Sequence, residues 1–316
     1  MKLVTVVSLT ALFAQPLAIQ HAFAANEPNI NLGAASGYNV FVFDDYLNKG
    51  WNSIGGALAV GGDANISLSG IANSAANPYG LVAGGNVVKT YGGINGQSWV
   101  GGNITKPEWD GYNNYISGPA PIDFAAAKTS LTKLSSDLSD VAMTGSIATK
   151  DQYNPNVMVF SGTSADVEFF SMDASQFSSF NTIQFSNVQS DATLIFNLSG
   201  TFAELGSQWG VFQNSNYNVL LNFYQATEVR VGSVYLSANI LAPNAVITNY
   251  WGGDVQGTVV ANSWNNTLTL HNDAFTAVNS ALLTSPVPEP NSYAMLIAGL
   301  MLVMMFARRQ SGRVAI

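Results

Sequence analysis

The feature that most constrains this chain is a short phrase repeated three times between residues 58 and 103: apolar residues, then Gly-Gly, then Asn or Asp. The Gly-Gly pairs begin at residues 61, 84 and 101, so the phrase recurs after 23 and then 17 residues. Such spacing is typical of chains in which one supersecondary unit stacks on the next. We expect Gly to supply positive φ values at a corner, and Asn or Asp to hydrogen-bond the backbone there.

Short β-branched stretches lie between these corners, among them Ile66, 87–88 and Ile104, as strands require. Strand-like segments separated by Ser, Asn and Gly return after residue 150, and two passages near the end, 240–247 and 255–263, again resemble solenoid turns. The sequence therefore predicts a mainly β protein built as a β-solenoid (β-helix). A β-sandwich with Gly-rich hairpins is the alternative.

A different pattern covers about residues 122–142 and predicts one long amphipathic helix. Its apolar residues are spaced alternately by three and four positions: Phe124, Ala127, Leu131, Leu134, Leu138 and Val141. Asp123 is placed to cap the helix start. A helix of roughly 30 Å with a single apolar stripe must lie along a larger body, and the flank of the solenoid provides it. We expect coils, then this helix, then further coils beside the first set.

Composition narrows the classes of function. Only 9% of the residues are charged, the formal net charge is −8 and the isoelectric point is near 4.5, so no basic surface is expected and nucleic acid is not an expected partner. The absence of Cys excludes disulfide frameworks, thiolate zinc sites and Cys nucleophiles.

Residues 1–24 have the three parts of a secretory signal peptide. Lys2 supplies the positive start, an apolar run follows, and Ala22-Phe23-Ala24 forms an A-x-A cleavage site. We expect export by the Sec route with cleavage after Ala24, leaving a domain over residues 25–284.

The other end, residues 285–316, closely resembles the PEP-CTERM sorting signal of Gram-negative bacteria. It contains a Pro-Glu-Pro motif, an apolar segment over 293–307 that is a candidate transmembrane helix, and a short basic tail. The residues that carry the motif and tail are Val287, Pro288, Glu289, Pro290, Arg308 and Arg309. The resemblance implies recognition by an exosortase-type transpeptidase, transient residence in the inner membrane, and delivery to the cell envelope or extracellular matrix. A plain C-terminal membrane anchor is the alternative.

Most of the remaining chain, about residues 29–278, resembles the choice-of-anchor A domain family. The resemblance rests on the Gly-Gly-Asn phrases and on four further passages, 38–42, 218–223, 237–245 and 257–262. The passage through 240–261 is also similar to the solenoid of bacterial ice-binding proteins, which implies a β-helix with a flanking helix. The resemblance implies an adhesive protein, and it transfers no catalytic residues.

Residues that could support catalysis are few. His271 is the one histidine downstream of residue 24, and no nucleophile elbow accompanies it. Asp44 and Asp45 are adjacent, so on a strand they would point to opposite faces. A β-helix polysaccharide hydrolase or lyase would need two carboxylates from different coils, and the candidates are Asp63, Glu108, Asp110 and Asp254. We expect these carboxylates to be solvated turn residues and the protein not to be an enzyme.

Two other ligands are considered. Calcium could be held by Asp63, Asn65 and backbone oxygens at a Gly-rich corner, but no calcium-binding repeat is present, so no metal site or cofactor is predicted. Ice binding would require ordered rows of Thr, whereas Thr267 and Thr269 form one isolated pair.

Aromatic residues close to Gly or Asn are the strongest surface signal, because sharp turns can hold a ring outward. The candidate glycan contacts are Trp51, Trp99, Trp109, Tyr250 and Trp251. Outward rings stack on sugar faces at low entropic cost; the alternative is that they cap the solenoid core. We therefore expect an exported, non-catalytic surface or matrix protein that contacts exopolysaccharide. A purely structural spacer remains a further alternative.

Overall fold

The computed structural model describes residues 29–48, 50–72, 77–249, 251–280 and 283. The signal segment, the sorting segment and Tyr250 lie outside the described residues. Within the described part of the chain, no helix has the length and apolar character needed to cross a membrane.

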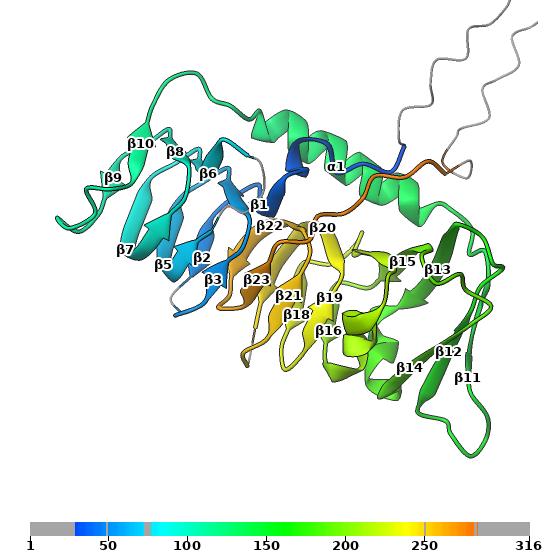
Figure 1. Ribbon diagram of the computed structural model, residues 1–316. Helices are drawn as coiled ribbons and strands as arrows, with labels where there is room; N and C mark the ends of the chain where they lie inside the picture. The colour runs from blue at the N-terminus through cyan, green and yellow to red at the C-terminus, as the bar shows by residue number, and fades with distance from the viewer. Residues whose placement is uncertain (1–28, 49, 73–76, 250, 281–282, 284–316) are drawn as a thin grey trace, which may run out of the picture.

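The strands stack in parallel coils around a common interior, and each coil contributes to up to three ladders (Figure 1). In spatial order, ladder A contains β13 (Val167–Asp173), β15 (Thr193–Ser199), β17 (Asn218–Asn222), β20 (Asn239–Thr248), β22 (Val259–Asn265), β1 (Tyr38–Val42), β4 (Ala57–Val60), β6 (Tyr79–Ala83), β8 (Gln97–Val100) and β10 (Asn114–Ile116). Ladder B contains β16 (Phe202–Leu205), β18 (Glu228–Val231), the ends of β20 and β22, β2 (Tyr46–Asn48), β5 (Ala64–Ile71), β7 (Val87–Ile94) and β9 (Ile104–Thr105). Ladder C contains β19 (Tyr235–Ser237), β21 (Asp254–Gln256), β23 (Thr269–His271), β3 (Ser53–Ile54) and the ends of β5 and β7. The predicted solenoid is confirmed, and the sandwich alternative is wrong.

The chain enters this stack in the middle. After η1 (Gly33–Ala35), the coil β1–β3 forms first, and the following coils wind toward one end, where β10 lies. Helix α1 (Phe124–Ser139) then crosses back along ladder A, and the coils from β13 to β23 return toward the middle (Figure 1). The last coil pairs with the first, with Val40 opposite Val259. The expected order of coils, helix and further coils is confirmed.

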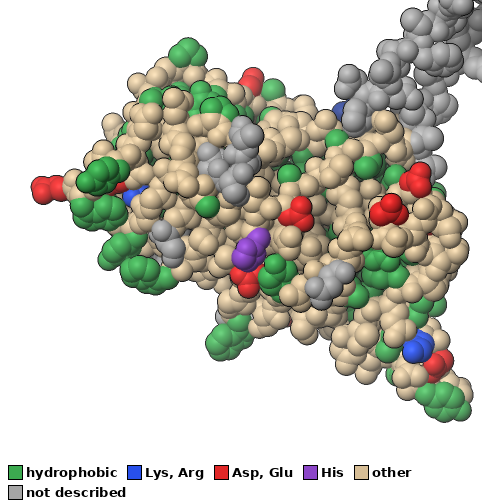
Figure 2. Space-filling view, in the orientation of Figure 1, with side chains coloured by type: hydrophobic (Ala, Val, Ile, Leu, Met, Phe, Trp, Pro, Cys, Tyr) green, Lys and Arg blue, Asp and Glu red, His purple; other side chains and the backbone are tan. Residues whose placement is uncertain are grey.

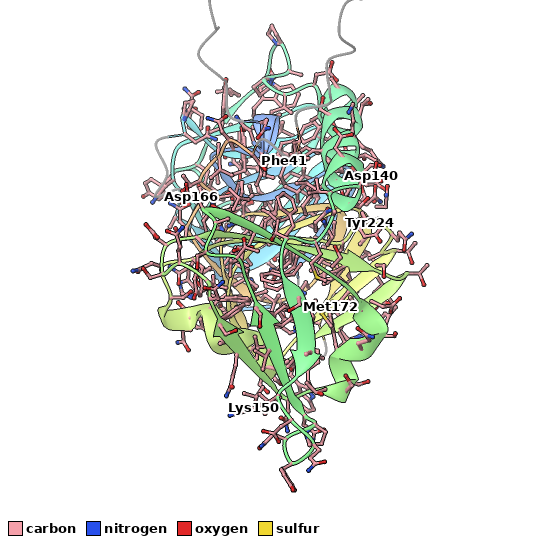
Figure 3. The ribbon with its side chains drawn as sticks, turned by 90° about the vertical axis from the view of Figure 1, so that its right-hand side faces the viewer. Phe41, Asp140, Lys150, Asp166, Met172 and Tyr224 are labelled. Atoms are coloured by element: carbon pink, nitrogen blue, oxygen red, sulfur yellow. The ribbon has the colours of Figure 1, made fainter. Side chains whose placement is uncertain are left out.

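The far end of the stack is closed by a small sheet of β11 (Ser146–Thr149), β12 (Val157–Ser161) and β14 (Thr182–Ser186), together with η2 (Ala174–Ser179) and η3 (Ser207–Asn214). Aromatic rings fill the interior there: Phe160 lies 5.2 Å from Phe196, and Phe196 lies 5.7 Å from Trp209, measured between ring centroids. Figure 3 shows this end toward the viewer, with Lys150 where the loop of the β11–β12 hairpin begins.

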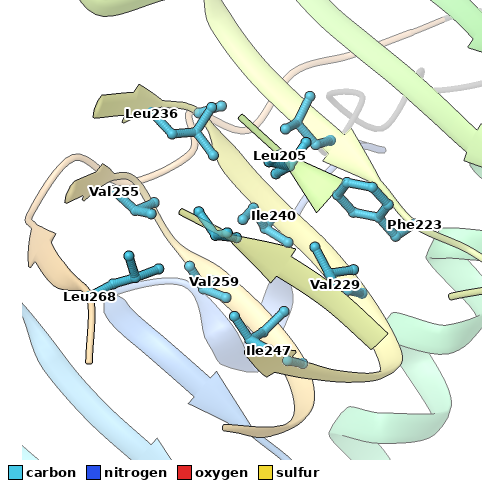
Figure 4. Packing of buried hydrophobic residues seen from close by; sticks show 14 of the residues in the cluster. Leu205, Phe223, Val229, Leu236, Ile240, Ile247, Val255, Val259 and Leu268 are labelled. Carbon is cyan, nitrogen blue, oxygen red and sulfur yellow. The ribbon is translucent and has the colours of Figure 1, made fainter. Parts of the chain in front are cut away.

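The interior is a stack of equivalent apolar rows, because side chains alternate between the two faces of each strand. One row on ladder A runs through paired positions of successive coils, and all of its members are almost fully buried: Phe196, Leu221, Ile240, Val259, Val40, Leu58 and Leu81. Figure 4 shows the three walls meeting: Ile240 and Val259 from ladder A, Val229 and Ile247 from ladder B, and Leu236 and Val255 from ladder C.

The outer face of ladder A is also apolar, and α1 covers it from β15 to β1. Asp123 caps the helix as expected, its Oδ1 accepting from the amide of Ala126 at 2.9 Å. The buried stripe of the helix includes Ala127, Leu131 and Leu138, and it lies on outward-facing residues of ladder A: Ile195, Leu220, Leu241, Val260 and Phe41. The helix has 16 residues, about 24 Å, so it is shorter than the predicted segment. Ladder A is therefore buried on both faces.

The Gly-Gly corners have a different physical basis from the one expected. None of the six glycines in the three phrases has a positive φ. Instead, a Cβ atom at Gly61, Gly84 or Gly101 would lie closer than 3.0 Å to a carbonyl oxygen of the neighbouring coil. Glycine is needed because the coils approach closely, not because the backbone is left-handed.

The Asp and Asn that end the first two phrases each accept a hydrogen bond from the next coil. The carboxylate of Asp63 accepts from the amide of Asn86 at 2.7 Å, and the side-chain oxygen of Asn86 accepts from the amide of Asn103 at 2.9 Å. The expected hydrogen bond to the backbone is present, but it joins neighbouring coils.

Replacing Gly84 by Ala should lower the free energy of unfolding by about 1–3 kcal/mol, because the added methyl group forces two coils apart. Urea denaturation followed by circular dichroism measures the loss. Gly93→Ala is the matched control, since a Cβ there meets nothing within 4 Å. Equal losses in the two variants would contradict the steric explanation.

Candidate functional site

Three exposed aromatic residues lie at the corner where the chain turns from ladder B to ladder C. Trp251 lies between β20 and β21, Trp51 lies between β2 and β3, and Tyr91 lies within β7. The alignment of the flanking strands, in which Thr248 and Leu47 both pair with Asn265, places both tryptophans at the same corner of their coils. We call Trp51, Tyr91 and Trp251 the aromatic edge.

The aromatic edge follows the long axis of the solenoid. One coil separates the coil of Trp251 from that of Trp51, and one coil separates Trp51 from Tyr91. Neighbouring strands are about 4.8 Å apart, so the backbone positions that carry these residues recur roughly every 10 Å. The exposed fractions are 68% for Trp251, 79% for Trp51 and 47% for Tyr91. Figure 2 shows hydrophobic side chains protruding along the lower edge of this view and few charged ones.

Close contacts between coils hold this corner. The rings of Trp51 and Tyr91 pack with their centroids 4.9 Å apart. Asn249 donates to the hydroxyl of Thr267 in the next coil at 2.9 Å and to the carbonyl oxygen of Trp251 at 3.2 Å. The rings are therefore presented by a corner whose backbone is already ordered. Tyr91 was not among the predicted contacts, although the Gly-Gly pair that follows it is the same turn signal.

The other two tryptophans predicted as glycan contacts lie elsewhere. Trp99 is only 7% exposed and packs in the cluster under α1, so the prediction that its ring points outward is wrong. The reason is that Trp99 belongs to the outer row of ladder A, which the helix side of the molecule covers; its indole donates to the carbonyl of Gly118 at 3.3 Å. Trp109 is 56% exposed, but it lies in the loop between β9 and β10 that closes this end of the stack.

That loop, residues 106–113, is fixed by a buried ion pair. Lys89 points into the solenoid interior, and its Nζ lies 3.2 Å from Oδ2 of Asp110; the two side chains are 0% and 1% exposed. Oδ2 of Asp110 also accepts from the hydroxyl of Tyr115 at 2.8 Å, and Trp109 lies over the Lys89 ammonium at 5.0 Å. Burial and the bond to Asp110 raise the pKa of Tyr115. Asp110 is thus a buried partner of Lys89, and the expectation of a solvated turn carboxylate is wrong for it.

The other candidate carboxylates are dispersed. Asp63 belongs to the Gly-Gly-Asp corner, Glu108 is exposed in the end loop, and Asp254 lies on ladder C. His271 is 3.2 Å from Asp254 and stacks on Tyr235, so it belongs to an exposed polar row. Asp45 accepts from the amide of Asp63. The structure does not bring these carboxylates into one groove.

The described ranges offer few residues arranged to bind a metal ion or ice. No group of three or more His, Asp or Glu side chains there could hold a metal ion. Thr267 lies at the aromatic edge and Thr269 on ladder C. Ice binding would require an ordered row of Thr. An outer row of ladder B instead mixes side-chain types across the coils: Glu204, Arg230, Thr248, Asn265, Leu47, Asn65, Val88 and Thr105.

Comparison with known proteins identifies the class. Residues 31–272 match the family described as "Putative Ice-binding-like adhesive domain", and the chain belongs to this family. A solved structure, the ice-binding protein of the Antarctic ascomycete Antarctomyces psychrotrophicus, matches with 17% sequence identity and a TM-score of 0.31, covering 79% of this chain and 99% of that one. No curated protein matches the chain. Family membership points to an adhesin-like domain at the cell surface or outside the cell, with a binding rather than an enzymatic role.

The buried pair that closes the β10 end can be tested by a double-mutant cycle. Lys89→Met should cost about 3–5 kcal/mol of unfolding free energy, because it leaves the Asp110 carboxylate buried without a cation. Asp110→Asn should be similarly destabilising, and the double variant should lose clearly less than the sum. Urea denaturation gives all three values. Additive losses would contradict a direct interaction between the two charges.

Proposed function

We propose that this protein is an exported, non-catalytic adhesin of the cell envelope or extracellular matrix, and that it holds exopolysaccharide along the aromatic edge. The observation that carries the proposal is the alignment of Trp251, Trp51 and Tyr91 on alternate coils, all largely or half exposed. Aromatic rings offer flat apolar surface with few rotatable bonds, so little entropy is lost when a sugar stacks on them. A row of rings parallel to the solenoid axis suits an extended polymer.

The position of the chain ends supports this arrangement. Ile30 and Val278 pair through two backbone hydrogen bonds of 3.0 and 3.1 Å, and Phe275, Val278 and Leu283 pack in the cluster under α1. Both ends of the described chain therefore emerge on the helix-covered side (Figure 1). The aromatic edge is the corner between ladders B and C, opposite ladder A. A tether continuing from residue 284 would leave the edge directed away from the surface that holds it.

Delivery to that surface is proposed to use the C-terminal sorting signal. In this proposal an exosortase-type enzyme recognises the Pro-Glu-Pro motif at 288–290 after Sec export, while the apolar segment 293–307 holds the chain in the inner membrane.

Replacing Trp51 and Trp251 together by Ala should weaken retention of the polysaccharide by roughly tenfold per ring, in line with aromatic hot spots. Residues 25–284, which contain every described element, are mixed with the producing organism's extracellular polysaccharide. Size-exclusion chromatography then follows protein co-elution and polymer length. Tyr153→Ala, at the hairpin tip with 84% exposure, is the control and should behave as the native chain.

Three outcomes would each contradict a different part of the proposal: the binding site, the adhesive role or the absence of catalysis. Unchanged co-elution of the double variant would contradict the aromatic edge, and no co-elution of the native chain would contradict polysaccharide adhesion. Shortened polymer would identify a hydrolase or lyase instead.

Sorting is tested separately in the producing organism. Alanine at Pro288, Glu289 and Pro290 should leave the protein in the inner-membrane fraction, detected by immunoblotting. Unaltered delivery to the envelope or medium would contradict recognition by an exosortase-type enzyme.

A further inference from the structure

A groove of about 800 Å³ crosses the outer face of ladder B at the far end of the solenoid, between η2 and β16. Residues of η2 and its N-cap form one wall, β16 forms the floor, and the start of η3 forms the roof. None of the residues predicted from sequence as glycan contacts lines it. The lining of the groove includes Asp173, Thr201, Phe202, Glu204, Gln208 and Ser233.

The floor carries an exposed aromatic ring. Ala203 and Leu205 are buried in the interior, so the alternation of β16 directs Phe202 and Glu204 outward. Phe202 is 43% exposed, and the guanidinium of Arg230 in the neighbouring coil lies 5.0 Å from its ring centroid. This cation–π contact orients the ring on the outer face.

The rim carries two carboxylates, and hydrogen bonds favour the ionised form of one of them, Asp173. Asp173 accepts from the amide of Ser175 at 2.8 Å and from the hydroxyl of Ser199 at 3.2 Å, and the hydrogen bonds from Ser175 are the main cause that lowers its pKa. Glu204 lies 3.4 Å from Arg230. Asp173 is therefore suited to accepting hydrogen bonds from a ligand rather than to acting as a general acid.

The groove is continuous with the aromatic edge. Ser233 lines the groove, and its amide donates to the carbonyl of Gly252, next to Trp251, at 2.9 Å. Six strand-to-strand steps separate β7, which carries Tyr91, from β16 at the groove. This is about 29 Å along the solenoid axis. An extended ligand lying on the three rings would reach the groove.

We propose that the groove is a second carbohydrate site that accepts an uncharged or cationic sugar unit and discriminates against uronic acids. An exposed ring beside carboxylate, hydroxyl and amide groups matches a sugar, which presents an apolar face and a rim of hydroxyl donors. The carboxylates of Asp173, Glu204 and Glu228 outnumber the single guanidinium of Arg230 around the groove, so a uronate would meet net repulsion. This inference rests on the proposed glycan-binding function and adds its specificity.

Isothermal titration calorimetry with residues 25–284 and three defined probes tests the inference: cellohexaose, the hexamer of glucosamine, and hexagalacturonate. The native chain should bind one or both of the first two at least tenfold more tightly than hexagalacturonate. Phe202→Ala should weaken that binding about tenfold, and Glu204→Gln should narrow the preference over hexagalacturonate several-fold. Tyr153→Ala, outside both sites, is the matched control.

The edge variant separates the two sites. Trp51→Ala/Trp251→Ala should lose affinity but keep the preference over hexagalacturonate, because the groove is intact. The groove proposal is overturned if Phe202→Ala and Glu204→Gln leave affinity and preference unchanged. It is also overturned if the native chain binds hexagalacturonate as tightly as the other two probes. If the native chain does not co-elute with the polysaccharide, the proposed function itself is overturned. Circular dichroism of each variant excludes unfolding as the cause of lost binding.

Discussion

The pairing of β1 with β22 is the interaction on which the rest of the molecule depends. It joins segments about 220 residues apart, with Val40, Phe41 and Val42 opposite residues 259–261. Asn39 adds side-chain hydrogen bonds to the carbonyl oxygens of Gly257 and His271, and the rings of Tyr46 and Trp264 stack across the same junction. Without this seam the chain would be two short solenoids, each with an open parallel edge.

The proposed aromatic edge depends on this pairing, whereas the groove lies within one half of the solenoid. Trp51 belongs to the first coil of one half and Trp251 to the other half, so the aromatic edge exists only when β22 lies between β20 and β1. The same pairing places Phe41 of β1 against Phe124 at the start of α1 and makes the apolar interior continuous. A local solution to packing, one coil on the next, therefore creates a surface longer than either half alone.

The sequence predicts those features that depend on residues within one coil or one helix. It does not predict the placement of side chains that depends on packing against a different element. The Gly-Gly-Asn phrases and the spacing of apolar residues in 124–141 predict the solenoid and its helix because both patterns are local. Trp99 and Trp51 have similar neighbours in the sequence, yet one is buried and one exposed, because only the assembled fold shows which face the helix side covers. Lys89 and Asp110 pair through the loop that closes the end, and Phe202 becomes part of a groove only because η2 packs beside β16. No periodicity in the sequence encodes these placements.

The position of the two chain ends has a mechanical consequence. A polymer bound at the corner between ladders B and C and a tether beginning near Ser280 would pull on opposite sides of the stack, across its long axis. The first and last segments are tied together by the Ile30–Val278 bridge and by the side-chain oxygen of Asn29, which accepts a hydrogen bond from the backbone amide of Ser280. Because glycan and tether engage different coils, tension would pass through the rows of hydrogen bonds between neighbouring coils and act on them side by side. Bonds loaded together share the force, whereas pulling on a terminal coil would break them one after another.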